Sequence, residues 1–286
     1  MVRLTECPRD AMQGIGTWIP TEDKIRYINS LLKVGFDVMD FGSFVSEKAV
    51  PQMRDTEEVL NGLTTETSTL LLAIVANERG ALKACEFERI RYIGYPFSVS
   101  ETFQRRNTNA GIAESVERLH SIMKAAGNAG KEVVVYLSMG FGNPYGDPWS
   151  PELVTEWCKR LYEETGARSM ALSDTVGVSD PENITALFSV LIPSLKDVSF
   201  GAHLHTTPSR WREKIVSAYE AGCRSFDGAL GGFGGCPMAA DDLTGNMPTE
   251  NLISYLKEKG EAERINTDHL RTSMHIMHEV FPNGEG

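Results

Sequence analysis

Two histidines stand one residue apart in the stretch GAHLHTTPS, which covers residues 201–209. On a β-strand, side chains two residues apart point to the same face, so His203 and His205 could grip one metal ion. Taken alone, this spacing is more often two imidazoles that are each satisfied by separate neighbours. The pair therefore indicates a metal site only if ligands from elsewhere in the chain join it.

Further polar residues follow other short apolar runs, at the positions where strands would end. They are Arg9 and Asp10, Asp40 and Ser43, Asp174 and Thr175, and Asn246. In a parallel barrel, the carboxyl ends of all strands meet at one rim, where the chemistry takes place. Asp10 and Asn246 would there add two oxygen ligands to the two imidazoles. Such a mixed set suits Mg2+ or Mn2+, with Zn2+ or Co2+ as alternatives, and leaves positions open for a substrate.

A glycine-rich segment, GALGGFGGCPMA, covers residues 228–239. The dinucleotide-binding frame G-x-G-x-x-G that begins at Gly232 fails, because Pro237 stands where the third glycine is required. We interpret the segment as a mobile lid. Cys236 on this lid could carry a proton in and out of a closed site, or it could be a small buried residue at a turn.

The apolar pattern alternates between short runs and amphipathic stretches, which is typical of a βα repeat. The runs cover residues 2–7, 36–42, 70–77, 89–95, 132–139, 169–174, 198–205 and 224–230. Eight such units predict an α/β fold, a closed (β/α)8 TIM barrel, in preference to an open doubly wound sheet. We expect one domain over residues 1–286, with the barrel in about 1–260 and an additional C-terminal helix in about 261–282.

Charge and cysteine content exclude several classes of partner. The 39 acidic and 28 basic residues give a formal net charge of −11, which would repel a nucleic acid. The five cysteines are scattered and odd in number, so they suggest neither a disulfide framework nor a cysteine-rich zinc site. The sequence lacks a secretory signal and any apolar stretch near the roughly 20 residues that span a bilayer. We therefore expect a cytoplasmic protein without a membrane or nucleic-acid partner.

A set of motifs in fixed order resembles the 3-hydroxy-3-methylglutaryl-CoA lyase family of metal-dependent TIM-barrel enzymes. The motifs are CPRDAMQ, SFVSEKAVPQM, SVSETFQRRNTN, LSDTVGV, GAHLHTT, GGFGGCPMA and TGNMPTENL, and they extend over nearly the whole chain. The resemblance implies cleavage of 3-hydroxy-3-methylglutaryl-CoA to acetoacetate and acetyl-CoA, as in leucine degradation. It also implies a divalent metal, an acyl-CoA substrate and a homodimer.

The resemblance also implies roles for individual residues. The metal would be held by Asp10, His203, His205 and Asn246. Catalysis would fall to Arg9, Asp10, His203, Cys236 and Asp40, with Cys236 as the proton donor to the acetyl carbon. The substrate would contact Gln13, Ser43, Asp174 and Thr175. Arg105 and Arg106, near the expected barrel mouth, could meet the phosphates of a large substrate.

Three positions depart from the pattern of that family: Ala11 replaces a glycine, Asp40 a glutamate, and Thr206 an acidic or amide residue. Ala11 could forbid a backbone conformation that glycine allows, and Thr206 removes a group that could orient a metal ligand. These departures leave alternatives open. The chain could cleave another hydroxyacyl-CoA, condense acetyl-CoA with a 2-oxo acid, or bind an acyl-CoA without turnover.

Overall fold

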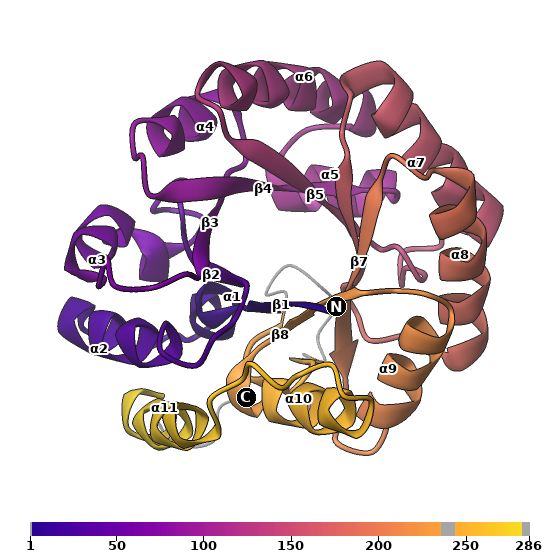
Figure 1. Ribbon diagram of the computed structural model, residues 1–286. Coiled ribbons are helices and arrows are strands. Elements are labelled where there is room, and N and C mark those ends of the chain that lie inside the picture. The colour runs from indigo at the N-terminus through magenta and orange to yellow at the C-terminus, as the bar shows by residue number, and fades with distance from the viewer. Residues whose placement is uncertain (1, 236–243, 282–286) are drawn as a thin grey trace.

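The computed structural model describes residues 2–235 and 244–281. Its centre is a closed ring of eight parallel strands, each paired with the next along the chain (Figure 1). The strands are β1 Arg3–Glu6, β2 Val38–Ser43, β3 Leu70–Ile74, β4 Ile90–Ser98, β5 Glu132–Ser138, β6 Ser169–Asp174, β7 Ser199–Thr206 and β8 Ser225–Gly228. The pairing of β1 with β8 closes the ring, with Arg3 opposite Ser225 and Glu6 opposite Gly228. The predicted barrel is therefore confirmed, and each of the eight predicted runs overlaps one of its strands.

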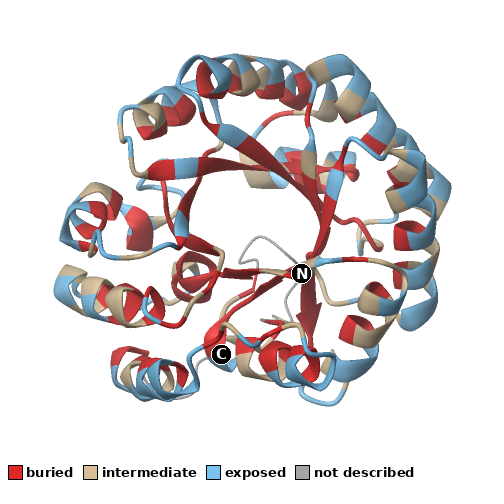
Figure 2. Ribbon diagram, viewed as in Figure 1, coloured by how far each residue is buried: buried red, intermediate tan, exposed pale blue. Residues whose placement is uncertain are grey.

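Helices surround the strands. They are α2 Thr21–Leu31, α3 Thr56–Gly62, α4 Glu78–Cys85, α6 Ile112–Asn128, α7 Pro151–Thr165, α8 Pro181–Ser194, α9 Trp211–Glu220 and α10 Thr249–Glu258. Each buries one stripe of side chains, as α6 does with Val116, Leu119 and Ile122. Figure 2 shows the buried residues on the strands and on the inward faces of the helices. Strands covered in this way are buried at nearly every position, which is why they read as continuous apolar runs.

Shorter elements occupy the loops at the carboxyl ends of the strands. They are α1 Pro8–Gln13, α5 Glu101–Thr108, the 3-10 turns η1 Pro51–Met53 and η2 Leu230–Gly232, and the two-residue strand β9 Gly245–Asn246. The sequence pattern did not predict any of them as separate elements, because each is too short to show a periodicity. Strand β9 pairs antiparallel with β7, with Asn246 opposite His205.

The additional C-terminal helix is α11, Thr267–Val280. It begins later than the predicted segment because Asn266 caps it, accepting hydrogen bonds from the backbone N–H groups of Asp268 and His269. The helix packs against α2, and the ring of Phe281 at its end lies 5.3 Å from that of Tyr27. The same Phe281 ring lies 5.0 Å from the ring of Phe233 in the glycine-rich segment.

A buried carboxyl group joins the first strand to the segments that follow the last one. Glu6, at the end of β1, accepts hydrogen bonds from the backbone N–H of Leu230 (2.9 Å) and from the hydroxyl of Thr249 (2.5 Å). Burial raises the pKa of Glu6 to about 8, although both hydrogen bonds act to lower it. A carboxyl group whose pKa is raised by folding stabilises the protein below its unfolded pKa, and this stability is lost as the pH rises through the folded pKa.

We predict that Glu6→Gln flattens the pH dependence of stability. Relative to this variant, the wild-type free energy of unfolding should fall between about pH 5 and pH 8, by at most about 1.4 kcal/mol per pH unit. Urea unfolding at four pH values measures the difference. Glu58→Gln, which changes an exposed carboxylate on α3, serves as the matched control and should follow the wild type. Parallel curves for wild type and Glu6→Gln would contradict the prediction.

Candidate metal centre and active site

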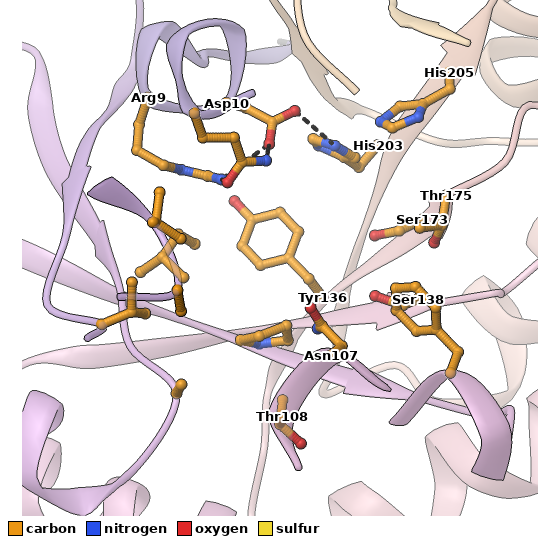
Figure 3. Close-up of a pocket in the computed structure, with 18 residues that line it drawn as sticks. Arg9, Asp10, Asn107, Thr108, Tyr136, Ser138, Ser173, Thr175, His203 and His205 are labelled. Carbon is orange, nitrogen blue, oxygen red and sulfur yellow. Dashed lines mark hydrogen bonds and ion pairs between the residues drawn. The ribbon is translucent and has the colours of Figure 1, made fainter. Parts of the chain in front are cut away.

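A cavity of about 180 Å3 opens at the carboxyl ends of the strands. Figure 3 shows its polar lining: Arg9 and Asp10 on α1, Asn107 and Thr108 on α5, Tyr136 and Ser138 on β5, Ser173 on β6, Thr175 just after it, and His203 and His205 on β7. Segments distant in the sequence thus converge at the rim where barrel enzymes carry their catalytic side chains.

Three of the predicted metal ligands lie together in this cavity. Asp10, His203 and His205 each offer a ligand atom, and these atoms all lie within 4.8 Å of one another. The two imidazole rings are 5.5 Å apart between centroids, because alternate residues of β7 point to the same side. The buried Nδ1 atom of His205 has no hydrogen-bond partner among the described residues. A donor set of one carboxylate and two imidazoles, with a nitrogen left unsatisfied, fits a divalent ion.

The fourth predicted ligand, Asn246, reaches the same carboxylate. Its side-chain amide donates hydrogen bonds to Asp10 Oδ2 at 2.7 Å and to the carbonyl oxygen of Phe233 at 2.9 Å. The amide nitrogen is thereby engaged, which leaves the amide oxygen of Asn246 as its candidate ligand atom. The glycine-rich segment passes directly over this contact. A Cβ atom on Gly234 would lie 2.5 Å from Asp10 O and 2.8 Å from Asn246 Nδ2, so only glycine fits there.

We call Asp10, His203 and His205 the metal group, since they are the predicted metal ligands that lie together. Arg9 connects this group to a second buried carboxylate. Its guanidinium donates to both oxygens of Asp40, with a shortest distance of 2.6 Å, and to Asp10 Oδ1 at 2.9 Å. Gln13 completes the network: it accepts from Arg9 at 2.7 Å and donates to Asp10 at 2.5 Å. Burial raises the pKa of Asp40 to about 6, although the adjacent Arg9 acts to lower it. At neutral pH the guanidinium therefore lies between two carboxylates.

Burial and mutual contact set the charges of the ligands. Burial acts to raise the pKa of Asp10, but Arg9 and then His203 outweigh it, and the net pKa lies below the usual value. Burial, followed by the neighbouring His203, lowers the pKa of His205 to about 4. The Asp10 carboxylate is thus charged and the His205 imidazole neutral at pH 7. These are the protonation states in which both groups bind metal ions.

Two residues that the sequence analysis did not single out surround His203. Asp227 on β8 lies opposite His203 in the strand register, and its Oδ2 is 3.1 Å from His203 Nδ1. The ring of Tyr136 meets the His203 ring edge-on, at 5.6 Å between centroids. Tyr136 and Asp227 are polar residues inside two of the predicted apolar runs, 132–139 and 224–230, and this position was the signal that could have identified them. With the Asp227 carboxyl oxygen as acceptor, the His203 proton would lie on Nδ1, which leaves Nε2 facing Asp10.

The predicted substrate-binding residues are divided between two locations. Gln13 and Thr175 line the cavity, and the Thr175 hydroxyl accepts a hydrogen bond from Met139 N. Ser43 and Asp174 do not line it. Ser43 is buried beside a separate surface groove, and its hydroxyl has no hydrogen-bond partner among the described residues.

Asp174 is fully buried in an ion pair with Lys214 Nζ, at 2.7 Å. It also accepts hydrogen bonds from the backbone N–H and the hydroxyl of Ser179. Lys214 in turn donates to the carbonyl oxygen of His205 at 2.7 Å. The position of Asp174 therefore fixes the backbone that carries His205, a predicted metal ligand. A direct contact between Asp174 and a substrate in the cavity finds no support in this geometry.

The remaining predicted positions can now be placed. Ala11 lies inside α1, where a helical backbone needs no glycine, so the expected conformational conflict does not arise. The Thr206 hydroxyl donates to Thr207 O rather than to a metal ligand. Arg105 is paired with Glu101, and Arg106 lies over the ring of Tyr145. Cys236 lies outside the described residues.

Comparisons with known proteins agree with this arrangement. The HMGL-like family model matches residues 4–276. The hydroxymethylglutaryl-CoA lyase YngG of Bacillus subtilis is 34% identical over 251 residues, which is 88% of this chain and 83% of that protein. A mitochondrial hydroxymethylglutaryl-CoA lyase of Bos taurus is 33% identical over 94% of this chain and 82% of its own length.

A solved structure is also similar. The HMG-CoA lyase of Acinetobacter baumannii, in complex with coenzyme A and 3-methylmalate, superposes with a TM-score of 0.89 and 31% identity. The match covers 98% of this chain and 91% of that one. Sequence and structure therefore agree on one assignment: the chain belongs to the HMGL-like family.

Proposed function

We propose that this protein is a divalent-metal-dependent lyase that cleaves 3-hydroxy-3-methylglutaryl-CoA to acetoacetate and acetyl-CoA. The convergence of Asp10, His203 and His205 in one cavity, with Arg9 beside them, carries the proposal. The names of the similar lyases and the coenzyme A in one of them support the same substrate class.

The residues Asp10, His203, His205 and Asn246 would hold the metal. Their nitrogen and oxygen atoms suit Mg2+ or Mn2+, while Zn2+ and Co2+ remain alternatives. A divalent ion at this position supplies Lewis acidity, which lowers the pKa of a substrate hydroxyl. We predict Mg2+ or Mn2+ as the resident ion in the cell.

The side chains of the cavity would divide the remaining work. Cleavage requires a base for the proton of the tertiary hydroxyl, and Asp10 or His203 is placed to accept it. The guanidinium of Arg9 would stabilise the negative charge that develops on the thioester enolate. Arg9 stays fixed for this role because Asp40 holds it through both carboxylate oxygens. The enolate then takes a proton at its terminal carbon. We assign Cys236 as the donor of this proton.

The direct test is a cleavage assay. After chelation, the purified protein should release acetoacetate from 3-hydroxy-3-methylglutaryl-CoA only when Mg2+ or Mn2+ is added back. His205→Ala should lower kcat/KM by about 100-fold or more, because it removes a ligand. His269→Ala, on the exposed face of α11, is the matched control and should retain wild-type activity. No release with either ion, from a folded protein, would reject the proposal.

A second prediction concerns the carboxylate behind His203. Asp227→Asn replaces a fixed acceptor with an amide that can also donate to Nδ1, which would move the imidazole proton to the metal-facing nitrogen. We expect the affinity for Mn2+ to fall about 10- to 100-fold, as measured by the paramagnetic resonance of free Mn2+.

The control for this prediction is Ser225→Ala, two residues earlier on the same face of β8. This control should bind Mn2+ like the wild type. An Asp227→Asn protein that binds Mn2+ as tightly as the wild type, with an unchanged circular dichroism spectrum, would show that Asp227 does not position the ligand.

The remaining expectations concern the location, the assembly and the metabolic role of the protein. No helix in the described part of the chain is long and apolar enough to cross a membrane. We further propose that the protein works in the cytoplasm as a homodimer, that residues 1–286 form one catalytic unit, and that it serves leucine degradation. Gel filtration and cell fractionation test the first two of these expectations.

A further inference from the structure

One side of the cavity is apolar. Its lining includes Val45, Ala49, Val50, Ile74, Ala76 and Pro96. These residues come from β3, β4 and the segments after β2 and β3, whereas the metal group stands on α1 and β7. All six are at least partly exposed to solvent. The structure thus leaves hydrocarbon from three neighbouring segments uncovered in the site, and we call these six residues the apolar strip.

The deep end of the apolar strip reaches the level of the metal group. Pro96 on β4 is paired in register with Tyr136 on β5. A Cβ atom on Gly94 would lie 2.4 Å from Ile74 Cδ1 and 3.0 Å from Tyr136 Cε2, so Ile74 and the Tyr136 ring approach each other across this glycine. The same Tyr136 ring also meets the ring of His203, at 5.6 Å between centroids. Tyr136 is therefore a common neighbour of Ile74 and of the metal group.

The charged residues of the cavity indicate whether the apolar strip can bind a carboxylate or an alkyl group. Among the described lining residues, histidines aside, Arg9 is the only cation, and Asp40 and Asp10 already engage it. A free carboxylate placed against Ile74 and Pro96 would lose its water without gaining a partner, which is unfavourable. An alkyl group in the same place would gain free energy by leaving water.

We propose that the apolar strip binds the substituent at C3 of the acyl group, so that the enzyme accepts 3-hydroxy-3-alkylglutaryl-CoA thioesters with an alkyl group longer than methyl. This inference rests on the proposed function. The hydroxyl of C3 lies at the metal group, and its alkyl substituent extends past Tyr136 toward Ile74, Ala76 and Pro96.

The reaction is unchanged by the longer substituent. The hydroxyl loses its proton, the bond between C2 and C3 breaks, and C3 becomes a ketone. The electron pair leaves with the thioester as an enolate, which takes one proton to give acetyl-CoA. With a propyl group the second product is 3-oxohexanoate, and no further reactant is consumed.

The test compares the methyl, ethyl and propyl thioesters with the wild-type enzyme and its preferred metal. We expect kcat/KM for the propyl compound to equal or exceed that for the methyl compound, since each buried methylene favours binding by about fourfold. A preference for methyl of about 100-fold or more would overturn the inference, because a pocket shaped for methyl rejects extra carbons at this level. No turnover of any thioester would instead reject the proposed function.

Two matched variants show which part of the substrate contacts the apolar strip. Ala76→Leu fills the strip just beyond strand β3, and it should lower kcat/KM for propyl at least tenfold more than for methyl. Ala49→Leu adds the same bulk at an exposed position of the strip, away from the three residues that the alkyl group would meet, and should change kcat/KM for all three thioesters by one common factor. If Ala76→Leu also changes the three thioesters by one common factor, the apolar strip serves the pantetheine arm and the inference is wrong. Circular dichroism confirms that each variant is folded.

Discussion

A single buried carboxylate holds the active site together. Asp10 contacts a guanidinium, two amide side chains and the imidazoles of the metal group, and these partners come from α1, β7 and β9. Removing a carboxylate from water is costly unless charges and donors replace the lost hydration. The partners of Asp10 supply that replacement. An ion in the site would add one more positive charge to a carboxylate that is already fixed in place.

The barrel stabilises this arrangement through buried polar contacts from distant parts of the chain. The His205 carbonyl is held by Lys214, which is itself neutralised by Asp174. The start of the glycine-rich segment is held by Glu6 from the first strand. Each support is a buried polar group with its hydrogen bonds made, so strand β7 and the backbone at Leu230 keep their positions without a ligand. The apolar strip, by contrast, has no such partners and stays open to a substrate.

The sequence predicted the eight strands well because a buried parallel strand is a short apolar run, and a chain of this length leaves few architectures for eight of them. It also predicted the convergence of Asp10, His203, His205 and Asn246, since strand ends meet at one rim. It could not predict which side chains at the strand ends face the cavity. Thr175 enters the cavity while its neighbour Asp174 turns to Lys214, and only the local backbone decides between them. Asp227 was missed because its partner lies on a neighbouring strand, 24 residues away.

The contact between Phe281 and Phe233 has a consequence for how the enzyme is made. A ribosome releases the barrel strands before α11, so the ring of Phe281 emerges when the strands can already collapse. Until then, Phe233 lacks one face of its packing and Tyr27 lacks its aromatic neighbour. The nascent polypeptide would therefore form the barrel before the ring contact between Phe281 and Phe233 can form.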